Sequence, residues 1–176
     1  LYMWMMKKLF SFFVSFLFPS ECYLCHKEGS CLCDTCILTL PKPVDTPAPF
    51  ITSLYSFKDH RIRKIIHAAK YFHRKDLLLT LGSKLSQELK SSNLTFDLII
   101  PIPMPKMREY IRGYNQAEIL ARTISDELGI PYSKDILLRD KQKSRQVLAR
   151  TRKARLRNQK HAFIIKKTLT QKNILL

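Results

Sequence analysis

Four cysteines near the start of the chain are spaced as metal ligands usually are. Cys22 and Cys25 form one Cys-x2-Cys pair, and Cys33 and Cys36 form a second pair after seven intervening residues. Four thiolates at this spacing can surround a zinc ion tetrahedrally. Because sulfur would fill every coordination position, we predict a closed, structural site. The alternative, in which the four thiols bind no metal, stays open.

Cys31 is a fifth cysteine in the same stretch. It could replace Cys33 only by breaking the second Cys-x2-Cys pair, so we leave it outside the ligand set. A module of about 20 residues is too short to hold a core by itself, and zinc binding contributes on the order of 10 kcal/mol in such peptides. The spacing therefore predicts a ribbon that depends on zinc for its folding.

A second candidate site follows the apolar run at residues 98–102. A short run with few polar residues predicts a strand that is buried on both faces. Pro101, Pro103 and Pro105 end its pairing, because proline lacks a backbone donor. We expect a loop after this strand, and Gly113 allows a sharp turn at its end. The basic residues of the expected loop are Lys106, Arg108 and Arg112.

A helix is expected next, over residues 116–128. Asn115 is a plausible N-cap, and Gly129 with Pro131 ends the helix. In a parallel α/β sheet, ligands bind beyond the carboxyl ends of the strands, and a helix N-terminus favours an anion there. Arginine and lysine would add charge-assisted hydrogen bonds to phosphate. The alternative is an ordinary strand–helix unit that is basic because the whole chain is basic.

Two motifs in this stretch resemble the ComF family. They are Pro101-Ile102-Pro103 and the run Arg112-Gly113-Tyr114-Asn115-Gln116-Ala117. The resemblance implies a double zinc ribbon, a type I phosphoribosyltransferase-like domain and a link to competence for DNA uptake. It also implies that a full-length member binds phosphoribosyl pyrophosphate with Mg²⁺. The pyrophosphate-binding residues that it implies here are Lys106, Arg108, Arg112, Gly113, Tyr114, Asn115 and Gln116; no catalytic residue is assigned.

The predicted fold is α/β. We expect an incomplete type I phosphoribosyltransferase-like parallel sheet with flanking helices, preceded by a small four-cysteine zinc ribbon. The expected parts are an apolar N-terminal helix at 1–19, the ribbon at 20–40, a proline-rich linker at 41–49 and the phosphoribosyltransferase-like domain at 50–176. Within that domain, residues 50–57 predict a strand and residues 59–71 a basic helix. His67 and His73 are expected to be surface or packing residues, because no second ligand lies at metal spacing.

Residues 9–18 form an apolar run that resembles the hydrophobic core of a signal peptide. It is too short to span a bilayer as a helix, and no small-x-small cleavage site follows. An odd number of cysteines also argues against a secreted disulfide framework. We therefore expect a cytoplasmic protein without a membrane span, whose N-terminal helix packs on the protein or on a partner.

Positive charge dominates the composition, with a formal net charge of +17. Residues 134–172 hold fourteen of the lysines and arginines but only two acids, Asp135 and Asp140. Such a balance favours a polyanion or a phosphorylated small molecule as the partner, although a solvated basic face is the plainer interpretation. Single-stranded DNA and DNA-uptake proteins are the candidate macromolecular partners.

The last residues, 173–176, predict the first half of another buried strand. In the ComF family such a strand leads into two acidic residues and a loop rich in threonine and glycine, which bind the sugar phosphate. Because this sequence lacks that signature, we expect a truncated family member without transferase activity. Three hypotheses stay open: a phosphoribosyltransferase-like protein, a zinc-ribbon protein that binds single-stranded DNA or a partner, and a non-functional remnant.

Overall fold

The computed structural model describes residues 20–44, 50–139, 162–166, 169–170 and 173–176. The fold is mixed α/β, with one small parallel sheet and one small antiparallel sheet. The chain divides into two compact units, Leu1–His67 and Ala68–Leu176. The division into four parts stays a prediction. The predicted N-terminal helix and most of the basic stretch at 134–172 lie outside the described residues. Within those residues, no helix is both long and apolar enough to cross a membrane.

The first unit contains the cysteines, helix α2 (Asp34–Leu38) and the beginning of helix α3 (His60–Tyr71). Its apolar core residues include Leu32, Leu40 and Ile65. The strand predicted at 50–57 is wrong, because these residues form turns and irregular backbone. Although the run is rich in β-branched and aromatic residues, no strand among the described residues pairs with it, and Phe50 and Phe57 at its ends are exposed.

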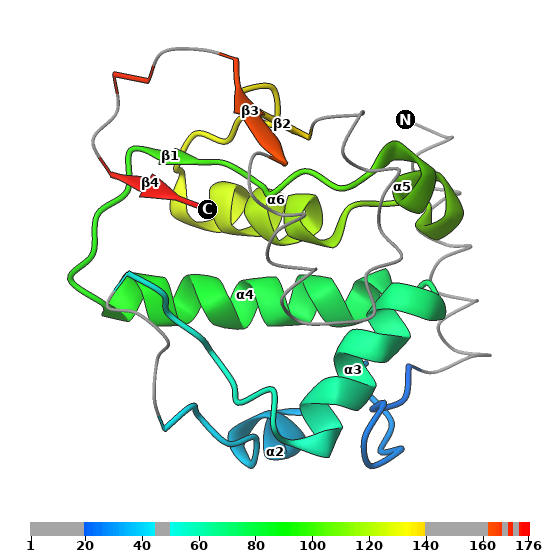
Figure 1. Cartoon of the computed structure of the whole chain (residues 1–176). Coiled ribbons are helices and arrows are strands. Elements are labelled where there is room, and N and C mark those ends of the chain that lie inside the picture. Colours follow the sequence, from blue (N-terminus) through cyan, green and yellow to red (C-terminus); the bar gives the residue numbers. More distant parts are fainter. Residues whose placement is uncertain (1–19, 45–49, 140–161, 167–168, 171–172) are drawn as a thin grey trace, which may run out of the picture. The chain divides into compact units, whose positions relative to one another are not determined.

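The second unit alternates short strands with helices (Figure 1). The leucine-rich helix α4 comes first, and its buried face is formed by Leu77, Leu78, Leu81 and Leu89. After the last residues of α3, the elements of the second unit in chain order are α4 (Lys75–Ser91), β1 (Leu98–Ile99), α5 (Lys106–Arg112), α6 (Gln116–Leu128), β2 (Leu137–Arg139), β3 (Phe163–Ile165) and β4 (Ile174–Leu175).

Strand β1 has a neighbour on each side. It pairs in parallel with β4, with Leu98 opposite Ile174. On its other side Ile99 forms a parallel bridge with Tyr132. Only 2% of the Ile99 surface and 2% of the Ile100 surface is exposed, so the interior strand is confirmed at the start of the predicted run. The strand ends at Ile99, and Ile102 at the end of that run is 48% exposed. The strand predicted at the end of the chain is present as β4, but its residues are half-buried rather than buried, and Leu176 is exposed.

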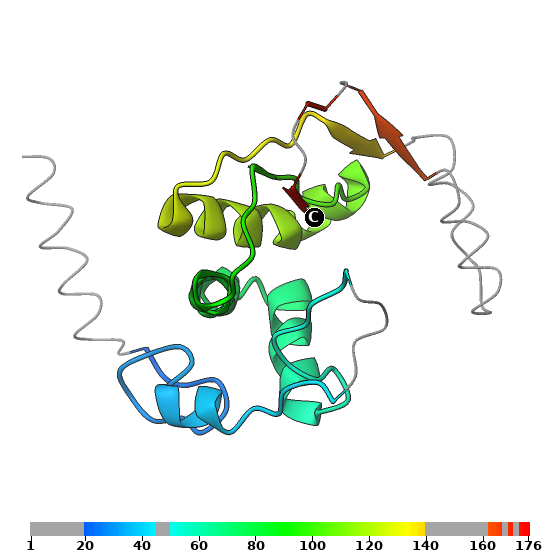
Figure 2. The same cartoon turned by 90° about the vertical axis from the view of Figure 1, so that its left-hand side faces the viewer.

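Helix α6 lies between the parallel strands and helix α4 (Figures 1 and 2). One core cluster joins the three layers through Leu89 of α4, Ile99 of β1 and Ile124 of α6. The helix begins where the sequence predicted it, and Gly129 ends it with a left-handed φ of 70°. Strands β2 and β3 form a separate antiparallel pair, in which Leu137 lies opposite Ile165.

Gly82 of α4 lies close against Thr123 of α6. A Cβ atom added at Gly82 would lie 2.9 Å from the Cβ atom of Thr123. We expect Gly82→Ala to lower the free energy of unfolding by about 1–3 kcal/mol, because overpacking outweighs the better helix propensity of alanine. Urea denaturation measures this change, and Gln87→Ala on the exposed face of α4 is the control. A Gly82→Ala protein as stable as the wild type would contradict the expected clash.

Candidate functional site

The four predicted cysteine ligands lie together in the first unit. The Sγ atoms of Cys22, Cys25, Cys33 and Cys36 are all within 4.8 Å of one another. The Sγ atoms of Cys25 and Cys33 are 3.6 Å apart. No part of Cys22 is exposed. The four side chains are thus positioned to bind one metal ion, and no other cluster of three or more potential ligands occurs among the described residues.

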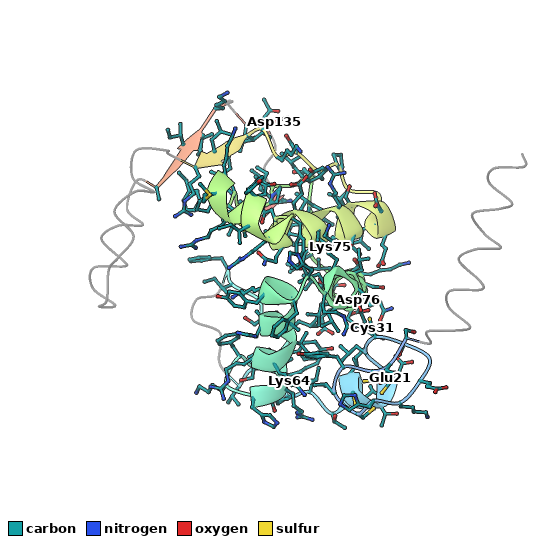
Figure 3. All side chains as sticks on the ribbon, turned by 90° about the vertical axis from the view of Figure 1, so that its right-hand side faces the viewer. Glu21, Cys31, Lys64, Lys75, Asp76 and Asp135 are labelled. Carbon is teal, nitrogen blue, oxygen red and sulfur yellow. The ribbon has the colours of Figure 1, made fainter. Side chains whose placement is uncertain are left out.

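Local backbone structure brings the two cysteine pairs together. A turn follows Cys22, in which the His26 amide donates to the Cys22 carbonyl at 2.8 Å. His26 takes a left-handed φ of 62° to reverse the chain. Cys33 is the N-cap of α2, and Cys36 projects from that helix one turn later. Figure 3 shows the side chains of this segment around the labelled Cys31, which does not belong to the four-sulfur cluster.

The pKa values of two of the clustered thiols indicate why a bound cation would stabilise this arrangement. Burial opposes ionisation of Cys22, but backbone amides, chiefly those of Cys33 and Cys25, donate to its sulfur and lower its pKa to about 6. Burial and the neighbouring sulfurs raise the pKa of Cys36 to about 12. Four thiolates this close repel one another, so they cannot all ionise without a positive ion among them. A divalent metal would remove that conflict.

An ion pair at the start of α3 joins this helix to the segment that follows the ribbon. The Arg61 guanidinium donates to Asp59 at 3.0 Å and to the Thr39 carbonyl at 2.9 Å. The hydrogen bonds from Arg61 lower the pKa of Asp59 to about 2. Asp59 also accepts from the Arg61 backbone amide at 2.7 Å, which is the geometry of a helix cap. The chain after the cysteines is therefore fixed to α3 at Thr39.

The basic segment after β1 is a helix, so the predicted loop at 106–112 is wrong. Helix α5 begins after Pro105, whose carbonyl accepts from the amides of Arg108 and Glu109. The segment KMREYIR contains no glycine or proline and consists mainly of good helix formers, which explains the difference. Gly113 ends the helix in the left-handed conformation at φ 72°. Lys106 and Arg108 are exposed on this helix.

Asn115 and Tyr114 face inward. The Oδ1 atom of Asn115 accepts from the Ala117 amide at 3.1 Å, so the predicted N-cap is confirmed. Its Nδ2 atom donates to the Ile102 carbonyl at 3.1 Å, which ties α6 to the chain leaving β1. The Tyr114 hydroxyl donates to the Ala69 carbonyl, and the ring packs in a buried cluster with Ala69 and Leu78. Both residues thus position the helix.

Arg112 connects α5 to the first residue of α6. Its Nη1 atom donates to the Gln116 Oε1 atom at 3.1 Å. Its guanidinium also lies 5.5 Å from the centre of the Tyr71 ring. The Gln116 Nε2 atom is buried and has no hydrogen-bond partner among the described residues. The seven residues implied for pyrophosphate therefore comprise two exposed cations, the linked pair Arg112 and Gln116, two packing residues and Gly113, which ends α5.

Sequence reasoning missed Arg139, at the end of β2. Burial and the positive charge of Arg108 both lower the pKa of this guanidinium. Its Nε atom is buried and lacks a partner in the part of the chain that the structure describes. The nearness of Arg139 to Arg108 concentrates positive charge beyond β1. Arg108 and Arg139 are 31 positions apart in the chain, so no local sequence pattern could have predicted that they interact.

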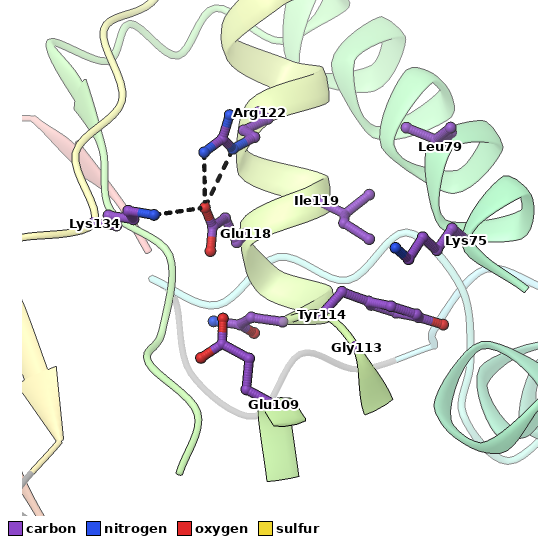
Figure 4. A pocket seen from close by; sticks show the side chains of 10 residues that line it. Lys75, Leu79, Glu109, Gly113, Tyr114, Glu118, Ile119, Arg122 and Lys134 are labelled. Carbon is purple, nitrogen blue, oxygen red and sulfur yellow. Dashed lines mark hydrogen bonds and ion pairs between the residues drawn. The ribbon is translucent and has the colours of Figure 1, made fainter. Parts of the chain in front are cut away.

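A cavity of about 380 Å³ opens beside the first turns of α4 and α6 (Figure 4). Glu118 is its central charged group and pairs with Arg122 at 2.9 Å and Lys134 at 3.4 Å. Burial opposes ionisation of Glu118, but these partners and the Tyr132 hydroxyl lower its pKa overall. The lining contains three cations, Lys75, Arg122 and Lys134, and two carboxylates, Glu109 and Glu118, so the cavity offers little net charge to an anion.

These features define a mixed α/β protein with a cluster of four cysteines positioned to bind a metal ion. The chain is similar to the "DNA utilization protein YhgH" of Salmonella typhimurium strain LT2, with 26% identity over 155 residues that cover 79% of this chain and 68% of that protein. The protein of the same name from Salmonella typhi matches at the same identity and coverage. No family model matches the chain, and no solved structure matches it.

Proposed function

We propose that this chain is a ComF-like protein that acts in the use of DNA, with a zinc ribbon and a phosphoribosyltransferase-like α/β unit. Two features support the proposal together: the four-cysteine cluster, and the similarity to proteins named for DNA utilization. The parallel pairing of β1 with β4 and the capped helix α6 are what such an α/β unit requires. Thiolate ligands need a reducing compartment, so we place the protein in the cytoplasm.

We propose zinc as the metal of the ribbon. Four soft sulfur ligands in a tetrahedral set favour zinc, and a closed set of four indicates a structural site. When bound, the ion would hold the turn after Cys22 against helix α2 and neutralise part of the thiolate charge. The function we propose for the ribbon is therefore to keep this segment folded.

We also propose that the exposed cations beyond β1 bind a phosphorylated small molecule. Lys106 and Arg108 are exposed, and Arg139 adds a third positive charge near Arg108. Arg112 is held at the first turn of α6 by Gln116. Arginine and lysine bind phosphate through charge-assisted hydrogen bonds. For phosphoribosyl pyrophosphate, Mg²⁺ would accompany the ligand.

Pyrophosphate with Mg²⁺ is the probe that tests this site. We expect isothermal titration calorimetry to detect binding to the wild type and a loss of about tenfold in affinity for Arg108→Gln, because a hydrogen bond to a charged group is worth about 1.5–3 kcal/mol. Lys90→Gln, which removes an exposed charge at the end of α4, is the matched control. Equal losses in the two variants, or no binding by the wild type, would rule out a phosphate site at α5.

Binding of single-stranded DNA is the second candidate function. The net charge of +17 and the printed name of the Salmonella proteins favour it. Contacts with several phosphates would make affinity fall steeply as salt rises. Affinity that does not change between low and moderate salt would exclude this mode of binding.

A further inference from the structure

A basic cavity of about 490 Å³ lies between the end of α3 and helix α5. The last turn of α3, the connection to α4 and the outer face of α5 contribute its walls. All of these segments belong to the second unit. The residues that line it, which we call the Tyr71 surface, are Lys70, Tyr71, His73, Arg108, Ile111 and Arg112.

The Tyr71 surface carries positive charge without a matching carboxylate. Three of its residues are lysine or arginine, and none is acidic. Among the described residues, no carboxylate lies within ion-pair distance of Lys70 or Arg108. Each cation can therefore meet an incoming phosphate without first breaking an ion pair to a described side chain. This distinguishes it from the neighbouring cavity, where Glu118 holds two cations.

An aromatic ring lies among these charges. The side chain of Tyr71 leaves 57% of its surface exposed, although the Arg112 guanidinium lies over the ring at 5.5 Å. Tyr110, on the same helix as Arg112, is 85% exposed. A ring and a planar guanidinium can each stack on a nucleobase. The combination of stacking groups and unmatched cations is how proteins bind single-stranded nucleic acid.

His73 holds the two walls of the surface together. Its backbone takes a left-handed φ of 53°, which is uncommon for a residue other than glycine. Its Nδ1 atom lies 3.1 Å from the Arg112 carbonyl. Because a carbonyl oxygen only accepts, Nδ1 must carry a proton and donate to it. This bond fixes the end of α5 against the turn after α3, so Tyr71 and Arg112 are placed before any ligand arrives.

We propose that the Tyr71 surface binds single-stranded DNA, with bases stacked at Tyr71 and phosphates bound by Lys70 and Arg108. A duplex would not fit this chemistry, because its base faces are already covered by stacking. The inference rests on the second candidate function and gives it a location. Arg108 is shared with the residues implied for pyrophosphate, but Lys70 and Tyr71 are not, so variants of these two residues test the Tyr71 surface separately.

Fluorescence anisotropy with a labelled oligothymidylate tests the proposal on the full chain. We expect Tyr71→Ala to weaken binding at least about fivefold through lost stacking, whereas Tyr71→Phe keeps the ring and the affinity. Lys70→Gln should lower the slope of log affinity against log salt by about 0.7. Lys90→Gln removes the same charge outside the surface and should leave the slope nearly unchanged.

Competing ligands distinguish this proposal from the binding of duplex DNA or of RNA. Duplex DNA of equal length should bind more weakly than oligothymidylate, and its tighter binding would overturn the proposal. Tighter binding of oligouridylate would assign the surface to RNA instead. Equal effects of Lys70→Gln and Lys90→Gln, or an unchanged affinity in Tyr71→Ala, would also overturn it. If the wild type binds zinc and pyrophosphate but no oligonucleotide, the surface assignment fails while the proposed α/β unit stands.

Discussion

Replacing Cys22 with serine is expected to abolish metal binding and to unfold the ribbon. Cys22 is the most buried of the four clustered cysteines, with no exposed surface, and its sulfur accepts from the Cys33 amide at 3.4 Å. A serine hydroxyl is a poor zinc ligand, so the loss should approach the binding energy of the site, on the order of 10 kcal/mol. Metal analysis of the purified protein should give about one zinc per wild-type chain and almost none for Cys22→Ser.

Cys31→Ser is the matched control, because this cysteine lies in the same segment but outside the cluster. It should keep the metal and the amide dispersion of the ribbon in NMR spectra. Cys33→Ser should behave like Cys22→Ser. Stoichiometric zinc in either ligand variant would show that the assigned set of four is wrong, and zinc loss in Cys31→Ser would show that the set is incomplete.

Replacing Asn115 with alanine should markedly lower the stability of the second unit. The substitution removes the cap on the Ala117 amide and leaves the Ile102 carbonyl without the Asn115 donor. A lost cap costs about 0.5–2 kcal/mol, and a buried group left unsatisfied costs about 1–3 kcal/mol. We therefore expect the free energy of unfolding to fall by about 2–4 kcal/mol in urea denaturation.

Asn115→Asp separates the two contributions. Aspartate retains an oxygen for the Ala117 amide but loses the donor for the Ile102 carbonyl, so its stability should lie between those of the wild type and Asn115→Ala. Pyrophosphate affinity should fall in Asn115→Ala, because α6 then loses its connection to the end of β1. A stability of Asn115→Ala within about 0.5 kcal/mol of the wild type would contradict the role assigned to this side chain.

Helix α6 and strand β1 could be predicted because their local signals agree with their environment. The helix has a capping asparagine before it, an apolar face along it and a glycine after it, and all three act in the structure. The strand is a continuous apolar run that is buried on both faces. The cysteine cluster was also predictable, because ligand spacing in two pairs constrains which sulfurs can meet.

The errors arose where a tertiary partner decides the structure. Residues 50–57 have the composition of a strand, but they pair with no strand in the part of the chain that the structure describes. Residues 106–112 followed prolines and carried charge, which favoured a loop, yet the run after Pro105 has helix-forming residues throughout. Two interactions join residues that are far apart in the chain: Arg108 influences Arg139, and His73 contacts Arg112. No local sequence pattern predicts either of them.

The four-sulfur cluster has an electrostatic consequence for what the ribbon can touch. Four thiolates around one divalent ion keep two negative charges, so metal loading makes this segment locally anionic. The pKa of Arg61 is raised chiefly by its hydrogen bonds to Asp59, and an ionised Cys36 adds to this shift. A loaded ribbon would therefore repel a nucleic-acid backbone at close range and attract a basic or uncharged protein face. In this chain a metal-loaded cysteine segment would be better suited to binding a protein than to binding a nucleic-acid strand.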